Sequence, residues 1–169
     1  MFVALVALMV MLVAPARGDQ PKVAVFDLEL LDTSLQGEMQ GVRKDEQARL
    51  VRITQQLRQA LADSGKFQVL DIAPVADAAH DSNLQACGGC DVKFAQKIGA
   101  DIAITGLVQK VSNLIINMNI YLHDVHTGKP IGAMSADMRG NTDESWTRTM
   151  EWLIRNRMLA PNYGALQAR

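Results

Sequence analysis

Two long strand-like segments joined by a short polar turn limit what this chain can fold into. They are DIAITGLVQKVS (101–112) and LIINMNIYLHDV (114–125), with Ser112-Asn113 at the turn. The second segment alternates with a period of two, so its two faces carry Ile116, Met118, Ile120 and Leu122 on one side and Asn117, Asn119, Tyr121 and His123 on the other. Such alternation is typical of a strand with one covered and one more polar face. We therefore expect an antiparallel pair inside a sheet.

Three further strands and several helices are expected around this pair. The strands are 22–31 (KVAVFDLELL), 66–71 (KFQVLD) and 130–140 (PIGAMSADMRG), all rich in apolar residues. The clearest helix spans 45–65, where Leu50, Ile53, Leu57 and Leu61 recur at helical spacing. Shorter helices are expected after Pro74 and over 91–99, and a last one from Asn141. The polar stretch 32–44 is predicted to be a loop.

This order of elements predicts an α/β fold that borders on α+β. Right-handed crossovers make the first three strands parallel neighbours, and short turns make the last three antiparallel. The expected result is a mixed five-stranded sheet of order 2-1-3-4-5, with about four helices packed against it. With 169 residues and 49% hydrophobic content, the chain suits one domain. We place it at 22–159, between a lead-in at 17–21 and a C-terminal tail at 160–169.

The N-terminus is predicted to be a signal peptide, residues 1–16. Met1 to Val13 is an uncharged apolar run, shorter than the roughly 20 residues of a transmembrane helix. Ala14-Pro15-Ala16 then fits the small-x-small pattern of a cleavage site, although no Lys or Arg precedes the run. A buried N-terminal helix is the alternative. Because no cysteine lies at the cleavage point, we expect a periplasmic protein without a membrane anchor after cleavage.

The composition argues against nucleic acid as a partner. The formal net charge is −1 and aromatic residues make up 5% of the chain. Neither a basic surface nor a set of base-stacking rings is therefore expected.

Cys87 and Cys90, in ACGGCD, are the only two cysteines of the sequence. They have three interpretations: a structural disulfide, a thiol redox centre, or part of a metal site. A redox centre of the thioredoxin type needs a core strand before the pair, and DSNLQA is polar. A zinc site needs about four ligands, and His80 supplies only a third. Export to an oxidising compartment favours a disulfide, and the other two interpretations remain as alternatives.

Acidic residues at the end of the first strand form the best candidate for a ligand cleft. Asp27, Glu29 and Asp32 lie there, at the carboxyl end of a predicted central strand. Ligands of open α/β sheets bind at such ends. The third predicted strand adds the rest of the candidate set: Thr105, Gln109 and Lys110. The alternative is that the acids pair with Arg or Lys of the first long helix.

Metal and catalytic motifs are weak or missing in the sequence. His123 and His126 are candidate metal ligands, but one falls on a strand and the other in a turn, so solvated turn residues are the simpler interpretation. No nucleophile elbow, P-loop, dinucleotide fingerprint or His-Glu-x-x-His box occurs. We expect no cofactor, no metal and no enzymatic activity.

The segment RGNTDESW is predicted to start the last helix. Asn141 as N-cap and Glu144 three residues later match a capping box. Arg139 precedes this box, and Trp146 begins the apolar stripe of the helix.

Several stretches together resemble a known family. They are KVAVFDLELLDTS, DEQARLVRITQQLRQAL, NLQACGGCD, GADIAITGLVQKVSNLIINMNIYLHD and RGNTDESWTR. They are similar to the domain of unknown function 3280, found in small secreted proteobacterial proteins, over 21–159. A looser set of turn and strand-end residues resembles the N-terminal domain of TolB and the curli secretion lipoprotein: Asp27, Gly99, Ala100, Asp101, Gly106, Asp124, Thr127 and Gly128.

The resemblance implies a non-catalytic protein that binds a partner protein or small ligand in the cell envelope. Some members of the family look to be encoded beside periplasmic quinoprotein alcohol oxidation systems, which implies an accessory role there. An exposed edge of the sheet, at the second or fifth predicted strand, suits a partner strand. The alternative function is thiol-disulfide or metal handling through Cys87 and Cys90.

Overall fold

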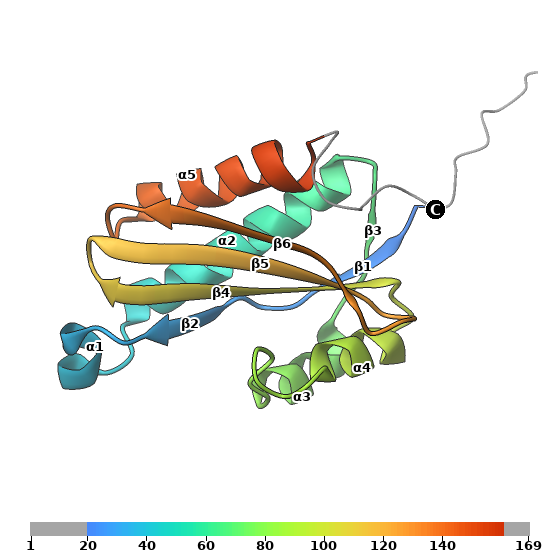
Figure 1. The fold of residues 1–169 in the computed structure, drawn as a ribbon, viewed down its shortest axis with the longest axis horizontal. Coiled ribbons are helices and arrows are strands. Elements are labelled where there is room, and N and C mark those ends of the chain that lie inside the picture. Colours follow the sequence, from blue (N-terminus) through green and yellow to red (C-terminus); the bar gives the residue numbers. More distant parts are fainter. Residues whose placement is uncertain (1–19, 161–169) are drawn as a thin grey trace, which may run out of the picture.

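A twisted sheet runs through the middle of the structure, a computed structural model that describes residues 20–160. Its strands are β1 (Lys22–Val25), β2 (Glu29–Asp32), β3 (Gln68–Val69), β4 (Ile102–Ser112), β5 (Ile115–Asp124) and β6 (Pro130–Met138). They lie in the order β3-β1-β4-β5-β6, with β2 also beside β4 (Figure 1). The predicted signal peptide and nearly all of the predicted tail fall outside the described residues.

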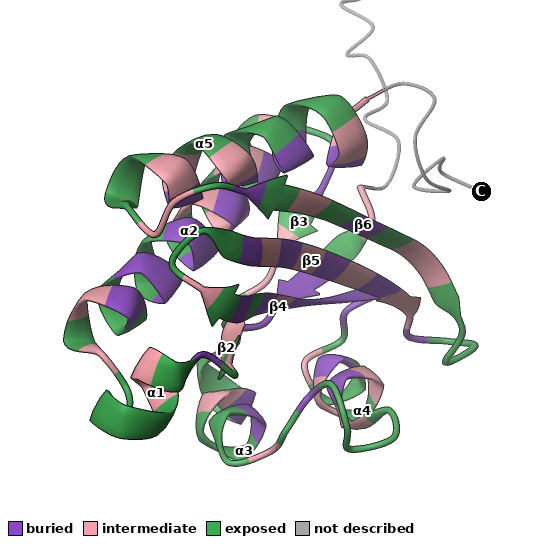
Figure 2. Cartoon of the chain, turned by 60° about the vertical axis from the view of Figure 1, so that its left-hand side comes forward, coloured by how far each residue is buried: buried purple, intermediate pink, exposed green. Residues whose placement is uncertain are grey.

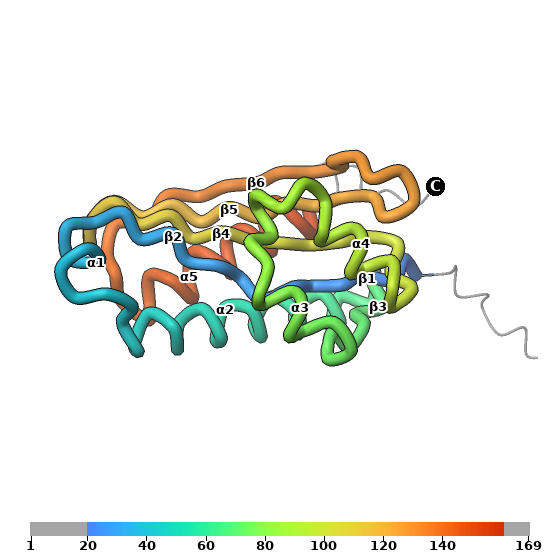
Figure 3. The backbone as a smooth tube through the Cα atoms, turned by 90° about the horizontal axis from the view of Figure 1, so that it is seen from below, coloured from blue at the N-terminus to red at the C-terminus, as the bar shows by residue number. Residues whose placement is uncertain are grey.

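Helices lie on both faces of this sheet. They are α1 (Leu35–Gln40), α2 (Lys44–Asp63), α3 (Ala76–His80), α4 (Cys90–Lys97) and α5 (Asp143–Leu153), with short turns of 3-10 helix at Ala73–Val75 and π-helix at Ile154–Met158. The long helices α2 and α5 pack side by side on one face, while α3 and α4 lie on the other (Figures 1 and 3). The predicted α/β class is confirmed.

The pairing of the strands follows the predicted order. β3, β1, β2 and β4 run parallel where they pair, and β4, β5 and β6 pair antiparallel. The apolar face of β5 is fully buried, as its alternation predicted, with side chains at 0–2% exposure: Ile116, Met118, Ile120 and Leu122. The sheet order 2-1-3-4-5, counted in predicted strands, is therefore confirmed.

The two faces of the sheet are covered to different extents. The larger core cluster fills the space under α2 and α5, around Trp146, Leu57 and Met118. A smaller cluster, around Phe26 and Ala103, packs against α3 and α4. These two helices cover only the half of the second face that lies away from α1 (Figures 1 and 2). The rest of that face, which includes Gln109 and Ser135, stays open.

Two stretches differ from the prediction near the N-terminus. The expected strand 22–31 is divided into β1 and β2, because the chain between them turns toward α2 and the Leu28 N–H donates to Thr54 Oγ1 at 3.1 Å. The expected loop 32–44 contains α1, whose first turn is capped when the Gly37 N–H donates to Ser34 Oγ at 3.1 Å. A helix this short carries little periodicity, so its cap is its main sequence signal.

Gly106 is required by the close packing of β4 against its neighbours. A Cβ at this position would lie 2.7 Å from Leu28 Cγ and 3.1 Å from the backbone oxygen of Asn119. We therefore expect Gly106→Ala to lower the free energy of unfolding by about 1–3 kcal/mol, measured by chemical denaturation. Gly132→Ala is the matched control, because its Cβ would lie 3.6 Å from the nearest atom, and it should change stability by less than about 1 kcal/mol. Equal effects of the two changes would contradict this packing argument.

Candidate functional site

A groove of about 590 Å³ lies between β2, α2, α3 and the segment 81–85. Its lining residues are Asp27, Leu28, Glu29, Leu30, Leu31, Gln47, Leu50, Val51, Thr54, Ile72, Ala76, Ala79, His80, Asp81, Ser82, Asn83, Leu84, Gln85 and Leu107. This volume falls in the usual range for ligand sites. The groove exists because β1 and β2 divide at Leu28, which leaves β2 without a neighbouring strand on the side of α2.

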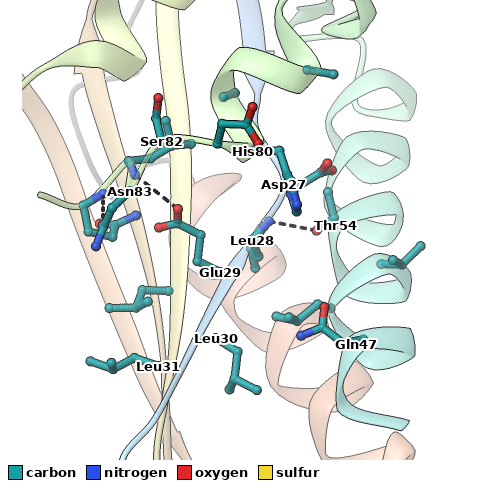
Figure 4. A pocket seen from close by; sticks show the side chains of 18 of the residues that line it. Asp27, Leu28, Glu29, Leu30, Leu31, Gln47, Thr54, His80, Ser82 and Asn83 are labelled. Atoms are coloured by element: carbon teal, nitrogen blue, oxygen red, sulfur yellow. Dashed lines mark hydrogen bonds between the residues drawn. The ribbon is translucent and has the colours of Figure 1, made fainter. Parts of the chain in front are cut away.

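The groove has a polar end and an apolar end (Figure 4). Leu30 and Leu31 lie at one end, and Asp27, Glu29 and His80 at the other, together with Ser82 and Asn83. The Leu84 N–H donates to Glu29 Oε1 at 3.1 Å, so this carboxylate holds the segment 81–85 against β2. Carboxylates line the groove, but Lys and Arg do not.

The structure does not bring the six predicted cleft residues together. Asp27 and Glu29 line the groove, and Asp27 Oδ1 also accepts from Arg58 of α2 at 2.9 Å, which is the alternative pairing. Thr105 is buried within the sheet, and Gln109 lies exposed on its open face. Strand alternation separates Asp32 and Lys110 from Glu29, Thr105 and Gln109, because the register pairs Glu29 with Leu107 and Asp32 with Lys110, on opposite faces of the sheet.

The other two residues of that set, Asp32 and Lys110, belong to a buried ion cluster. Lys110 Nζ lies 2.9 Å from Asp32 Oδ2 and 2.7 Å from Glu46 Oε1, and the Lys110 side chain is fully buried. Burial by itself lowers the pKa of Lys110, but its hydrogen bonds to Glu46 and Asp32 outweigh this effect, so the pKa is raised. For Asp32, burial by itself raises the pKa, but hydrogen bonds from Ser34 and Lys110 outweigh this effect, so the pKa of Asp32 is lowered.

The predicted RGNTDESW motif is joined to this cluster through Asn141. The Asn141 amide donates to Glu46 Oε1 at 2.5 Å, and Trp146 Nε1 donates to Asn141 Oδ1 at 2.9 Å. The helix is capped one residue later than predicted: Thr142 is the N-cap of α5 and accepts from the Ser145 N–H. Asn141 is engaged by Glu46 and Trp146 instead, which is why the expected capping box does not form.

Two side chains of the motif point away from the cluster. Glu144 pairs with Arg148 on the surface of α5, and Arg139 is exposed. Glu46 is the central member that the sequence did not reveal, because an acidic residue in the first turn of a helix has an ordinary electrostatic role there.

Cys87 and Cys90 form a disulfide at the start of α4, with their Cα atoms 5.7 Å apart. Gly88 and Gly89 between them adopt positive φ angles of 66° and 90°, which glycine tolerates best. Cys90 is the first residue of α4 and packs against the smaller core cluster. The pair therefore fixes where α4 begins.

The two histidines bind separate aspartates. His123 Nδ1 lies 2.6 Å from Asp91 Oδ2, and His126 Nε2 lies 3.1 Å from Asp101 Oδ1. Within residues 20–160, no group of three or more His, Cys, Asp or Glu side chains is arranged to hold a metal ion.

Helix α1 and the β4–β5 turn lie at the same end of the molecule (Figure 1), and most of the exposed large apolar residues of the described chain belong to these segments or adjoin them. We call this the end surface, and its residues are Leu31, Leu35, Met39, Val42, Val111, Leu114 and Ile115. Gln36 Oε1 of α1 accepts from the Asn113 amide of the turn at 3.1 Å, so the two segments are joined. The groove opens beside this surface, since Leu31 lines both.

With this geometry in place, the family can be assigned. A model of the DUF3280 family, described as "Protein of unknown function (DUF2380)", matches residues 21–158. The chain belongs to the DUF3280 family. A sequence search of the curated proteins finds no match. The predicted family resemblance is thus confirmed, and the family match spans the sheet, the groove and the ion cluster.

Solved structures share this DUF3280 fold at low sequence identity. The C-terminal domain of LpoB from Salmonella enterica is 18% identical, with 70% of this chain and 82% of that chain covered and a TM-score of 0.51. Lipoprotein GNA1162 from Neisseria meningitidis is 16% identical, with 84% and 98% covered and a TM-score of 0.50. TolB from Acinetobacter baumannii matches at a TM-score of 0.38, over 29% of that chain. The first two likenesses establish the fold.

Breaking the buried ion cluster should destabilise this DUF3280 chain strongly. Lys110→Met would leave two buried carboxylates without their cation, so we expect the free energy of unfolding to fall by about 3–5 kcal/mol in urea denaturation. Lys129→Met, at an exposed turn, is the control and should be nearly neutral. Adding Glu46→Gln to Lys110→Met should recover part of the loss. If Lys110→Met were as stable as Lys129→Met, the assignment of a buried ion cluster around Lys110 would be contradicted.

Proposed function

We propose that this chain is a non-catalytic protein of the cell envelope that binds a partner protein on its end surface. The observation that carries this proposal is the clustering of apolar exposure. Of the nine large apolar side chains that are exposed within residues 20–160, seven belong to the end surface. Apolar groups gathered in this way, rather than scattered, mark interaction sites.

The end surface has the features of a protein interface. Leu35, Met39 and Leu114 are 71–77% exposed, so they would bury much apolar area on binding. Hydrogen bonds hold the segments that carry them: Asn113 donates to Gln36, and Asn141 donates to Asn113 at 3.0 Å. Preformed surfaces lose less entropy on association.

A protein partner fits this surface better than a membrane does. Helices that lie on membranes are long enough to bury an apolar stripe and carry Lys and Arg on their polar face. Helix α1 has only six residues. Its first turn carries the acidic Glu38, and its last turn carries no basic residue. The open, polar half of the sheet face next to it also suits the rim of a protein interface.

The envelope location is supported by the sequence and by the fold. The apolar N-terminal run and its small-x-small site predict export, and the shared fold occurs in a protein named as a lipoprotein. None of the helices within residues 20–160 has the length and apolar content to cross a bilayer. A periplasmic accessory to an oxidation system is the finer form of this proposal.

The end surface makes the proposal testable with point variants. We expect Leu35→Asp and Leu114→Asp to abolish capture of a partner from envelope extract, because each places a charge in the centre of the apolar area. Trp152→Asp is the matched control: Trp152 is also exposed, but it lies on α5 outside the end surface. Affinity capture with quantitative mass spectrometry measures the loss. A partner retained by both end-surface variants would contradict the proposal.

One observation favours thiol–disulfide exchange as a second candidate function. Cys87 is exposed and its Sγ accepts from the Cys90 N–H at 3.3 Å, an arrangement that stabilises a thiolate at the start of a helix. The packing of Cys90 against the smaller core cluster favours a structural bond instead.

A redox titration separates these two roles of the disulfide. We expect the pair to behave as a structural disulfide, with a reduction potential below about −300 mV in glutathione or dithiothreitol buffers. Quantifying free thiols at each potential gives this value. A potential well above that limit would establish exchange as the better assignment.

A further inference from the structure

The groove runs along an unpaired edge of the sheet. The Thr33 N–H donates to Lys110 O at 2.9 Å, and β2 pairs with β4 from Glu29 to Asp32. In a parallel pair, alternate residues direct their backbone groups to opposite sides. Glu29 and Leu31 therefore share the β4 side with Thr33, and Leu30 directs its N–H and C=O into the groove. Within residues 20–160, no second strand pairs with β2.

A side chain binds the backbone N–H just before this edge, whereas no strand pairs with the edge itself within residues 20–160. The Leu28 N–H is taken up by Thr54 of α2, where the chain passes under the helix. After that point, α2 and β2 separate and the groove opens, with Leu30 on its lining. A recessed edge of this kind accepts an extended segment and excludes the broad edge of a folded sheet, which is how short edges avoid aggregation.

The electrostatics of the groove select the charge of its occupant. Asp27, Glu29 and Asp81 line it, and none of its lining residues is Lys or Arg. Asp27 is already paired with Arg58 of α2, so Glu29 and Asp81 carry the negative charge that a ligand can meet. Asp27 and Glu29 lie toward one end, while Leu30 and Leu31 lie toward the other (Figure 4). The complementary ligand carries a positive charge at one end and apolar groups along the rest.

We propose that the groove binds an extended peptide segment of a partner protein, which adds to the sheet as a strand along β2. A basic side chain of the segment lies beside Glu29 and Asp81, and its apolar side chains pack over Leu30 and Leu50. Four residues of β2 offer an edge of roughly 13 Å, enough for a segment of similar length. This proposal deepens the proposed partner-binding function by adding a second contact, which adjoins the end surface at Leu31.

A random peptide library displayed on phage tests the proposal with the purified protein as target. We expect the selected peptides to share one Lys or Arg followed or preceded by alternating apolar residues. Synthetic peptides of the selected sequence then measure affinity by fluorescence anisotropy. Two N-methylated versions of each peptide are compared, one methylated at the odd and one at the even peptide bonds. One version should bind at least tenfold more weakly and the other should change much less, because only alternate N–H groups of an added strand face β2.

Protein variants locate the binding. Leu30→Pro removes the N–H that faces the groove and leaves the ladder to β4, so affinity should fall about tenfold. Glu29→Gln keeps an acceptor for the Leu84 N–H but removes a charge, and should weaken binding about threefold at low salt. Glu151→Gln, on the far side of α5, is the matched control. Circular dichroism of each variant checks that it folds.

The outcomes distinguish this proposal from the proposed function. Selection of no peptide, equal binding of both N-methylated versions, or insensitivity to Leu30→Pro in a folded variant would overturn strand addition. Selected peptides without a basic residue would overturn the charge argument. Leu35→Asp and Leu114→Asp should leave peptide binding intact, so a failure of the groove leaves the end surface to be judged by partner capture alone.

Discussion

The buried Lys110 is the interaction on which the rest of this structure depends. Its ammonium group lies at the point where β2, β4 and the start of α2 meet, and Asn141 joins the start of α5 to the same carboxylate of Glu46. A charge without water is costly unless it is paired and hydrogen-bonded. Only one arrangement of these four elements supplies both carboxylates, and Glu46 Oε2 is left without a protein partner even there. The cluster therefore specifies geometry more than it adds stability.

That geometry creates the two surfaces that remain free. Lys110 joins the end of β2 to the start of α2 through Asp32 and Glu46, and the groove lies along β2 between this junction and the bond from Leu28 to Thr54. The same pairing places α1 next to the β4–β5 turn, where its apolar residues stay exposed. The larger core lies between one face of the sheet and the helices α2 and α5. Because most of the apolar burial is on that side, part of the other face can stay uncovered.

The sequence predicted what depends on local periodicity and missed what depends on distant partners. The alternation in β5 and the spacing in α2 predicted which of their side chains are buried, and right-handed crossovers with short turns predicted the sheet order. The capping box at Asn141 was wrong because Glu46, 95 positions away, competes for that side chain. Asp27 and Glu29 were selected as cleft residues by strand position, yet the walls that α2 and the segment 81–85 supply could not be inferred, since no local pattern encodes which helix faces a strand. Asp32 and Lys110 carried no signal that distinguished an internal ion pair from a ligand contact.

The segment that forms one wall of the groove is held by one side-chain hydrogen bond and is followed directly by the disulfide. Glu29 holds the Leu84 N–H on one side, and the disulfide closes the chain between Cys87 and Cys90 on the other. Thiols in the cytosol are kept reduced, whereas exported proteins meet an oxidising solution. In the export that we propose for this chain, the disulfide forms only after translocation. A copy retained in the cytosol would keep the bond from Leu84 to Glu29 and would carry two free thiols beside this wall of the groove.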